Sequence, residues 1–309
     1  MILCLGTTPA VQRTMIFKAL SIGAVNRAAQ VIESPAGKSV NVAKILHTLG
    51  QATIATGFLG GDRGQQMRRW LDEAGVPHDF VPVRANTRMC VTLIDQSGNE
   101  HTELVEESPQ VEEGAWETLL AKLERLLEGA RMLVLSGTLV PGGPHDFYAR
   151  CARSARQRSV PVIADAAGHA LLATLPERPL VVKPNRPELA ATFGKPLDTD
   201  DALRAAMLSL IERGANSVVI TLGAQGAAVT DGKQFWRVHS PKVTAVNSIG
   251  SGDSFTAGLA ARLAHGESLA EACRYGAACG AANALTLVSG KVHLDDVRLL
   301  HQQASVEPM

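Results

Sequence analysis

Short apolar runs alternate with longer segments of helical periodicity through most of the 309-residue chain. Polar residues do not interrupt the apolar runs, a pattern typical of strands that are buried on both faces of a parallel sheet. The predicted strands are residues 1–5, 53–58, 131–135, 160–164, 179–183 and 216–221. The predicted helices are residues 39–49, 63–74, 112–128, 144–158, 199–213, 251–265 and 268–286. This alternation predicts right-handed crossovers and a layered α/β sandwich.

Two stretches interrupt the alternation. Residues 10–35 and 86–107 contain strand-like segments with no helix between them. We expect them to form a small β-sheet that is inserted into a single α/β domain spanning residues 1–309. Such a sheet beside a cleft at the strand ends can act as a lid, and an edge extension that only buries surface is the alternative. The tail, residues 302–309, is expected to fray.

Single residues mark several helix ends. Gly50 and Gly75 directly follow two predicted helices, as expected of residues that end a helix in the left-handed conformation. Asp62 and Thr199 lie at the starts of the predicted helices 63–74 and 199–213 and are predicted N-caps. These four positions therefore predict helix boundaries independently of the apolar periodicity.

The composition narrows the class of protein. Lys+Arg and Asp+Glu both number 30, so the formal net charge is zero. Binding to a nucleic-acid backbone needs an excess of cations on one face, so nucleic acid is not an expected partner, although two or three cations can hold a small anion. No run reaches the ~18 apolar residues that span a bilayer, so no membrane partner is expected. The start does not resemble a signal peptide, and five scattered cysteines without a CxxC pair favour a cytoplasmic protein.

The sharpest chemical signal is the segment 247–258, Asn-Ser-Ile-Gly-Ser-Gly-Asp-Ser-Phe-Thr-Ala-Gly, in which two glycines lead into a predicted helix. Glycines at a helix start let backbone amides approach a ligand closely, and the unpaired amides and the helix dipole favour an anion such as phosphate. Asp253 in this segment has two explanations. It is either an N-cap that stabilises the helix by ~1 kcal/mol, or a carboxylate that accepts a hydroxyl proton as a phosphoryl group arrives.

Two other nucleotide-binding motifs are disfavoured. The segment 36–39, Ala-Gly-Lys-Ser, would belong to a P-loop only with glycine at position 32, which is Ile32. The segment 250–252 has Phe255 where a dinucleotide fingerprint has its third glycine. A P-loop NTPase and a Rossmann dehydrogenase are therefore the weaker hypotheses.

Polar or glycine-rich segments follow three further predicted strands. Lys183, Asn185 and Glu188 lie where a strand passes into a helix, a place at which open α/β sheets bind ligands. Glu188 fits a ligand of hydrated Mg²⁺, but a Pro-fixed turn with Glu in the first helical turn explains it equally well. The glycines of the segment 221–226 either approach a flat ligand or make a tight turn, and the segment 136–144 is predicted to be a loop.

Taken in order, these segments resemble the motifs of the ribokinase-like (PfkB) carbohydrate kinases, within them the phosphofructokinase and tagatose-6-phosphate kinase branch. The resemblance extends from residue 1 to about residue 300, and its most specific part is the segment 247–258, which is similar to the C-terminal signature of the family. Other matching segments are 37–43, 57–62, 136–138, 183–188 and 221–226. The resemblance implies a three-layer α/β/α sandwich with a mostly parallel central sheet and a small β-sheet lid, and a sugar kinase that uses ATP and Mg²⁺.

The resemblance also implies roles for individual residues. Asp253 would be the catalytic base, and the amides of Gly250, Ser251 and Gly252 would form an anion hole for the transferred phosphoryl group. The residues implied to bind the nucleotide are Lys183, Asn185, Glu188, Thr221, Gly223, Gly226 and, near the adenine, Asn283; Glu188 would also bind Mg²⁺. The residues implied to contact the sugar or its phosphate are Gln12, Arg27, Gly37, Lys38, Asn41, Arg88 and Ser136. Cations at 38 and 88 also make physical sense, since a phosphorylated acceptor needs positive charge.

The departures from the family pattern all lie on the acceptor side. Gln12 stands where the family has aspartate, Ala36 and Ser39 stand where it has glycines, and Val105 stands where the branch often has asparagine. The phosphoryl-transfer residues are intact. The sequence therefore predicts an ATP-dependent kinase for a hexose phosphate of the fructose 1-phosphate, fructose 6-phosphate or tagatose 6-phosphate type. The alternatives are a non-catalytic or regulatory sugar-phosphate-binding protein, and a kinase for an unphosphorylated sugar or nucleoside. By analogy, a homodimer through the lid is a further expectation.

Overall fold

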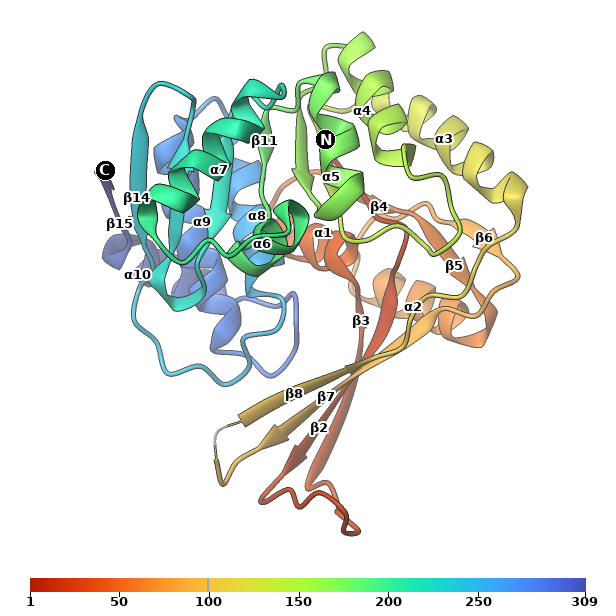
Figure 1. Cartoon of the computed structure of the whole chain (residues 1–309). Coiled ribbons are helices and arrows are strands. Elements are labelled where there is room, and N and C mark those ends of the chain that lie inside the picture. The colour runs from red at the N-terminus through yellow and green to blue at the C-terminus, as the bar shows by residue number, and fades with distance from the viewer. Residues whose placement is uncertain (99) are drawn as a thin grey trace.

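The computed structural model describes residues 1–98 and 100–309, and the described residues form three sheets of very different size (Figure 1). The largest sheet has nine strands in the order β15-β14-β13-β12-β11-β10-β9-β1-β4. Its strands are β1 Ile2–Leu5, β4 Thr53–Thr56, β9 Met132–Ser136, β10 Val162–Asp165, β11 Val181–Val182, β12 Val218–Thr221, β13 Ala227–Thr230, β14 Phe235–His239 and β15 Ser305–Pro308. Every pair from β4 to β12 is parallel, and the pairs from β12 to β15 are antiparallel.

Helices cover both faces of this sheet. One face packs against α1 Lys38–Thr48, α2 Gly61–Glu73, α8 Ser251–Leu263, α9 Leu269–Ala284 and α10 Leu294–Gln303. The other face packs against α3 Glu113–Leu127, α4 Phe147–Gln157, α5 Gly168–Thr174, α6 Arg186–Phe193 and α7 Asp200–Glu212. Strand β1 shows why the predicted strands are apolar throughout, since Ile2 and Cys4 belong to the first core and Leu3 and Leu5 to the second. The predicted three-layer sandwich is confirmed.

A separate small sheet projects from the body beside α1 (Figure 1). Its order is β3-β2-β7-β8, with β2 Ala10–Phe17, β3 Gln30–Ala36, β7 Arg88–Asp95 and β8 Glu100–Val105. Strand β2 alternates as a strand with two unlike faces should, because Gln12 and Thr14 are buried whereas Arg13 and Met15 are partly exposed. A third, two-stranded sheet pairs β5 Phe58–Gly60 with β6 Val81–Val83.

Three details of the sequence prediction are tested at the helix and chain ends. Thr199 is the N-cap of α7, and its hydroxyl accepts a hydrogen bond from the Ala202 amide at 3.2 Å, as predicted. Asp62 is not an N-cap, because α2 already begins at Gly61 and Gly60 occupies the cap. The tail does not fray, since β15 pairs antiparallel with β14 and closes the edge of the large sheet. Among the described residues, no helix is long and apolar enough to cross a membrane.

Candidate active site

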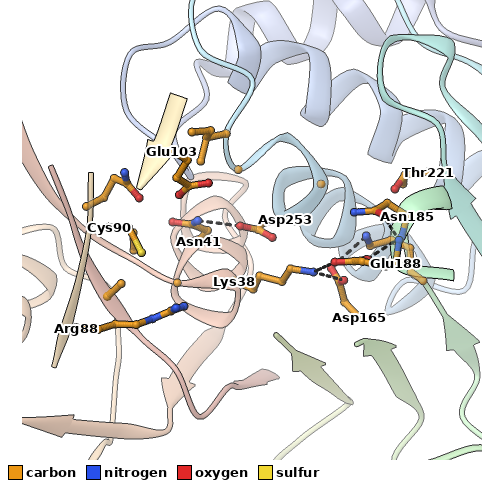
Figure 2. Close-up of a pocket in the computed structure, with 18 residues that line it drawn as sticks. Lys38, Asn41, Arg88, Cys90, Glu103, Asp165, Asn185, Glu188, Thr221 and Asp253 are labelled. Atoms are coloured by element: carbon orange, nitrogen blue, oxygen red, sulfur yellow. Dashed lines mark hydrogen bonds and ion pairs between the residues drawn. The ribbon is translucent and has the colours of Figure 1, made fainter. Parts of the chain in front are cut away.

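A cavity of about 350 Å³ lies where the carboxyl ends of the parallel strands approach the small sheet. Figure 2 shows Arg88, Cys90 and Glu103 on one side and Asp165, Asn185 and Glu188 on the other, with α1 and α8 residues between them. The lining residues are Ala10, Gln12, Ala36, Gly37, Lys38, Asn41, Arg88, Cys90, Glu103, Asp165, Lys183, Asn185, Glu188, Thr221, Ile249, Gly250, Gly252 and Asp253. The structure thus brings together most of the residues that the sequence analysis selected.

Asp253 is the third residue of α8 and points into this cavity (Figure 2). Gly250 is the N-cap, and no side chain caps the helix, so the capping explanation of Asp253 is wrong. One carboxylate oxygen accepts a hydrogen bond from Asn41 Nδ2 at 2.8 Å. Burial raises the pKa of Asp253 to about 6, an effect that Lys38 and the Asn41 bond oppose and the charge of Asp165 reinforces. A carboxylate with a pKa in this range is suited to accepting a proton near neutral pH.

The start of α8 is shaped by its glycines. Gly250 has φ +85°, and a Cβ atom there would lie 2.9 Å from the Gly290 nitrogen, so this turn requires glycine. Gly252 faces open space, because no atom other than those of its chain neighbours and its own helix backbone lies within 4 Å of the position its Cβ would take. As first-turn amides, those of Gly252 and Asp253 have no acceptor within the helix and are available to an anion. The Ser251 amide is less available than predicted, since it donates to the Ser248 carbonyl at 3.2 Å.

Asp165, which the sequence analysis did not select, is the most heavily bonded carboxylate of the site. It ends β10, is fully buried, forms an ion pair with Lys183 Nζ at 3.1 Å, and accepts hydrogen bonds from Lys38 Nζ at 3.2 Å and Thr256 Oγ1 at 2.7 Å. Burial alone would raise its pKa, but Lys183 and Lys38 outweigh burial and lower the pKa below its usual value. An acidic residue directly after the predicted strand 160–164 is the signal that could have identified it.

Glu188 has one carboxylate oxygen in the start of α6 and the other in the cavity. It forms a capping box with Asn185, in which Glu188 Oε2 accepts from the Asn185 amide at 2.8 Å and the Glu188 amide donates to Asn185 Oδ1 at 2.7 Å. Its second oxygen, Oε1, accepts from Lys38 Nζ at 2.9 Å inside the cavity. One oxygen is therefore structural, and the other faces the place where a ligand would bind.

Lys38 lies between the two carboxylates of Asp165 and Glu188 (Figure 2). Although burial opposes it, the charges of Asp165 and Glu188 raise the pKa of Lys38 above its usual value, so the side chain is a fixed cation. Lys38 was predicted to contact the sugar phosphate, whereas its ammonium reaches the strand-end side of the cavity. Two carboxylates that share one cation are a donor set that fits hydrated Mg²⁺, which needs only one or two protein carboxylates.

The cavity wall that the small sheet contributes is polar and has both a positively and a negatively charged side chain. The Arg88 guanidinium donates to the carbonyls of Thr8 at 3.1 Å and Glu106 at 3.3 Å, and its Nε is buried without a partner among the described residues. Gln12 Nε2 donates to Thr92 Oγ1 at 2.7 Å, which fixes the orientation of the amide. Glu103 of β8 was not selected from the sequence. Partial burial raises its pKa, although Arg88 opposes the rise.

Six predicted residues are absent from the cavity wall, one of them Ser251, whose amide is described above. Arg27 is exposed in the segment that joins β2 to β3. Ser136 is buried at the end of β9. Gly223 lies in a short 3₁₀ helix, Gly223–Gln225. Gly226 has φ +92°, and a Cβ there would collide with the Val238 carbonyl oxygen, so the tight turn explains this glycine.

Asn283, the sixth, has a different position from the one predicted near the adenine. It is fully buried, Nδ2 donates to the Ile249 carbonyl at 2.9 Å, and Oδ1 accepts from the Gly290 amide at 2.9 Å. Both ends of the side chain are therefore used behind the start of α8. The prediction failed because a motif position does not reveal which way a helical side chain points.

The first-turn amides of α8 lie beside Asp253, a carboxylate of raised pKa. This arrangement suits an enzyme that transfers a phosphoryl group to a hydroxyl. This class of protein agrees with the comparison of the sequence with known families. The sequence model of the pfkB family carbohydrate kinases matches residues 1–289, so the chain belongs to this family. It is accordingly a phosphotransferase with an alcohol group as acceptor, a sugar kinase.

Solved structures with the same fold extend over nearly the whole chain. Phosphofructokinase-2 from Escherichia coli in complex with fructose-6-phosphate is 28% identical, with a TM-score of 0.88 and 98% of each chain covered. A candidate 1-phosphofructokinase from Thermotoga maritima is 25% identical, with a TM-score of 0.91, and covers 100% of this chain and 99% of its own. Arabidopsis thaliana ribokinase complexed with ribose and ATP, at 20% identity, a TM-score of 0.77 and coverage of 97% and 98%, shares the fold.

Proposed function

We propose that the protein transfers the γ-phosphoryl group of MgATP to a hydroxyl of a hexose phosphate, with Asp253 as the base. The observation that carries this proposal is the position of Asp253, which is 7% exposed yet lines the cavity beside the first-turn amides of α8. A non-catalytic binding protein has no need to bury a carboxylate whose pKa is raised to about 6. The two phosphofructokinase structures described above favour a phosphorylated hexose as the acceptor.

The reaction places different demands on the two sides of the cavity. The amides of Gly252 and Asp253 stabilise charge on the phosphoryl oxygens, and Asp253 accepts the proton of the attacking hydroxyl. Lys38 and Lys183 supply fixed positive charge at the strand ends. When bound, Mg²⁺ neutralises charge on the nucleotide phosphates, and Glu188 with Asp165 would hold it. The α8 start has the open space that a phosphoryl group needs, because Gly252 presents no side chain.

The small-sheet wall fits an acceptor that carries both hydroxyls and a phosphate. Arg88 has an unpartnered Nε and can meet a phosphate oxygen, while Gln12 can accept hydrogen bonds from sugar hydroxyls through Oε1. Glu103 adds an anionic acceptor for hydroxyls on the same wall, which offsets the loss of the aspartate that Gln12 replaces. Ser39 does not bear on the acceptor, because it is buried and packs towards Gly6.

A screen for ADP release tests the proposal. The panel is fructose 1-phosphate, fructose 6-phosphate, tagatose 6-phosphate, free fructose, ribose and adenosine, each with MgATP, and Asp253→Asn is the matched control. We expect turnover with at least one hexose phosphate and a loss of at least ~10³-fold in Asp253→Asn. Turnover with only free sugars or nucleosides would refute a hexose phosphate as the acceptor and support the alternative kinase. Sugar-phosphate binding without any ADP release would establish the regulatory alternative.

The small sheet also presents an apolar outer face, for which we propose a second copy of the chain as partner. Val31 and Leu104 are 51% and 53% exposed, and the strand register places them on the face opposite Gln12 and Cys90. Such exposed β-branched and leucine side chains on a projecting sheet favour sheet-to-sheet association. Light scattering should show a dimer for the wild type and a monomer for Leu104→Glu. A monomeric wild type would refute the homodimer.

A further inference from the structure

Lys44 lies on α1, three residues beyond Asn41, and main-chain groups hold its ammonium. Its Nζ donates hydrogen bonds to the carbonyl oxygens of Pro35 and Ser289, both at 2.9 Å. These acceptors belong to segments that are far apart in the sequence, namely the end of β3 and the loop that follows α9. One side chain therefore connects the small sheet to the C-terminal half of the large domain. Neither the motifs of the sequence nor the proposed chemistry assigns it a role.

The Pro35 carbonyl belongs to the acceptor side of the cavity. Pro35 is followed by Ala36 and Gly37, which both line the cavity. Gly37 has φ +102° and is the N-cap of α1, so its position depends on how β3 is held at this point. Fixing the Pro35 carbonyl therefore fixes the wall that a sugar would touch.

The Ser289 carbonyl belongs to the phosphoryl side. Ser289 and Gly290 pack directly against Gly250, where an added Cβ would lie 2.9 Å from the Gly290 nitrogen and 3.0 Å from Ser289 Cβ. The Gly290 amide donates to Asn283 Oδ1, and Asn283 Nδ2 donates to the Ile249 carbonyl, both at 2.9 Å. The loop that Lys44 holds is therefore the support behind the start of α8.

The charged groups around Lys44 leave its ammonium sensitive to pH. Burial lowers the pKa of Lys44 to about 8; Asp253 on α8 opposes this and Lys291 on the loop adds to it. Lys44, His47 and Lys291 line a second cavity of about 210 Å³ with Trp70 of α2, and no carboxylate is among the described residues that line it. In the neutral state the amine has one donor fewer and weaker hydrogen bonds.

We infer that Lys44 is a positioning residue for phosphoryl transfer: its ammonium fixes the acceptor wall at Pro35 and the support of the anion hole at Ser289 relative to each other. The inference rests on the proposed function, because it concerns the alignment of that site. A near-attack geometry is sensitive to displacements of about 1 Å, so loosening either contact should slow transfer more than it weakens binding. Lys44 is not among the residues that line the first cavity, so it would act through Pro35 and Ser289.

Three variants separate this role from a general structural one. Lys44→Met removes the two hydrogen bonds at similar volume, Lys44→Arg keeps a cation that does not titrate, and Lys291→Met is the control in the same cavity. With MgATP and the sugar phosphate that supports wild-type turnover, we expect Lys44→Met to lower kcat by ~10–100-fold with KM for ATP within about threefold. Lys291→Met should stay within about twofold of wild type, and Lys44→Arg should recover most of kcat.

The pH profile gives a readout that lost packing would not change. Wild-type kcat should decline above pH ~8 as Lys44 loses its proton, and in Lys44→Arg this decline should be absent up to pH ~9.5. Amide hydrogen exchange in residues 30–37 and 283–291 should rise in Lys44→Met and not in Lys291→Met. Unchanged exchange, or wild-type kcat in Lys44→Met, would overturn the inference. Exchange that rises as expected in a chain that phosphorylates no sugar would instead refute the proposed function.

Discussion

Asp253→Asn is expected to stabilise the folded protein while it abolishes turnover. Burial raises the pKa of this carboxyl from 3.8 to about 6, so the folded state disfavours the charged form. Because one pKa unit corresponds to 1.36 kcal/mol, holding Asp253 charged costs the folded state about 3 kcal/mol at neutral pH. Asparagine removes the charge and keeps an oxygen that can accept from Asn41. For a chain of this length, a gain of that size raises Tm by about 5 °C.

The size of this stabilisation depends on pH. The penalty is fully present above pH 6, where Asp253 is charged in both the folded and the unfolded state. It decreases between pH 6 and 3.8, where the folded carboxyl is protonated first, and is absent below 3.8. The Tm advantage of Asp253→Asn should therefore be largest at pH 7–8 and disappear near pH 4. Wild-type kcat/KM should fall below pH 6, since the base is then protonated.

Asp165→Asn is the matched control, and we expect it to destabilise the folded protein, the opposite of the effect of Asp253→Asn. The pKa of Asp165 is lowered, because Lys183 and Lys38 outweigh its burial, so its charge stabilises the folded state. Removing that charge leaves Lys183, which is 2% exposed, without its partner, at a cost of about 3–5 kcal/mol. Thermal unfolding at several pH values, with ADP release measured in parallel, checks both variants. A lower Tm for Asp253→Asn than for wild type at pH 8, or a gain that persists unchanged at pH 4, would refute the reasoning.

Three further substitutions have defined outcomes. Glu188→Gln should raise the Mg²⁺ concentration for half-maximal rate about tenfold, measured by titration with MgCl₂, because a carboxylate is lost from the cation site. Arg88→Met should raise KM for a phosphorylated sugar ~100-fold and leave KM for ATP within about threefold. Gly226→Ala should lower the free energy of unfolding in urea by more than ~2 kcal/mol, since alanine would collide with the Val238 carbonyl at φ +92°.

The layers of the fold were predictable because the burial pattern is local. A strand that is apolar at every position, such as Ile2–Leu5, must be covered on both faces, and the two cores of the sandwich do this. Helix ends were less predictable. Thr199 was assigned correctly, whereas Asp62 lies one residue inside α2, since a glycine can end the preceding strand and cap the helix without a side chain.

The candidate site was predictable where a motif is continuous and not where contacts are distant. The segment 247–258 carries Asp253 and its glycines on adjacent residues, so its chemistry can be read directly. Asp165 does not belong to a continuous motif of this kind, because its partner Lys38 is 127 positions away. Glu103 depends on strand register, since it reaches the cavity only because β8 pairs Glu103 with Thr92 of β7. Asn283 was misplaced because its role depends on the direction of its side chain.

The site contains two buried aspartates, and their environments decide which of them can be the base. Asp165 is surrounded by Lys183, Lys38 and Thr256, which lower its pKa and contact both of its carboxylate oxygens. Asp253 has one hydrogen-bond donor, a raised pKa and a position beside unpaired amides. Groups whose environments move their pKa values apart take different roles, and we therefore propose Asp165 as an anchor for cations and Asp253 as the proton acceptor. The residue type is the same at both positions, and the assignment comes from the neighbouring lysines.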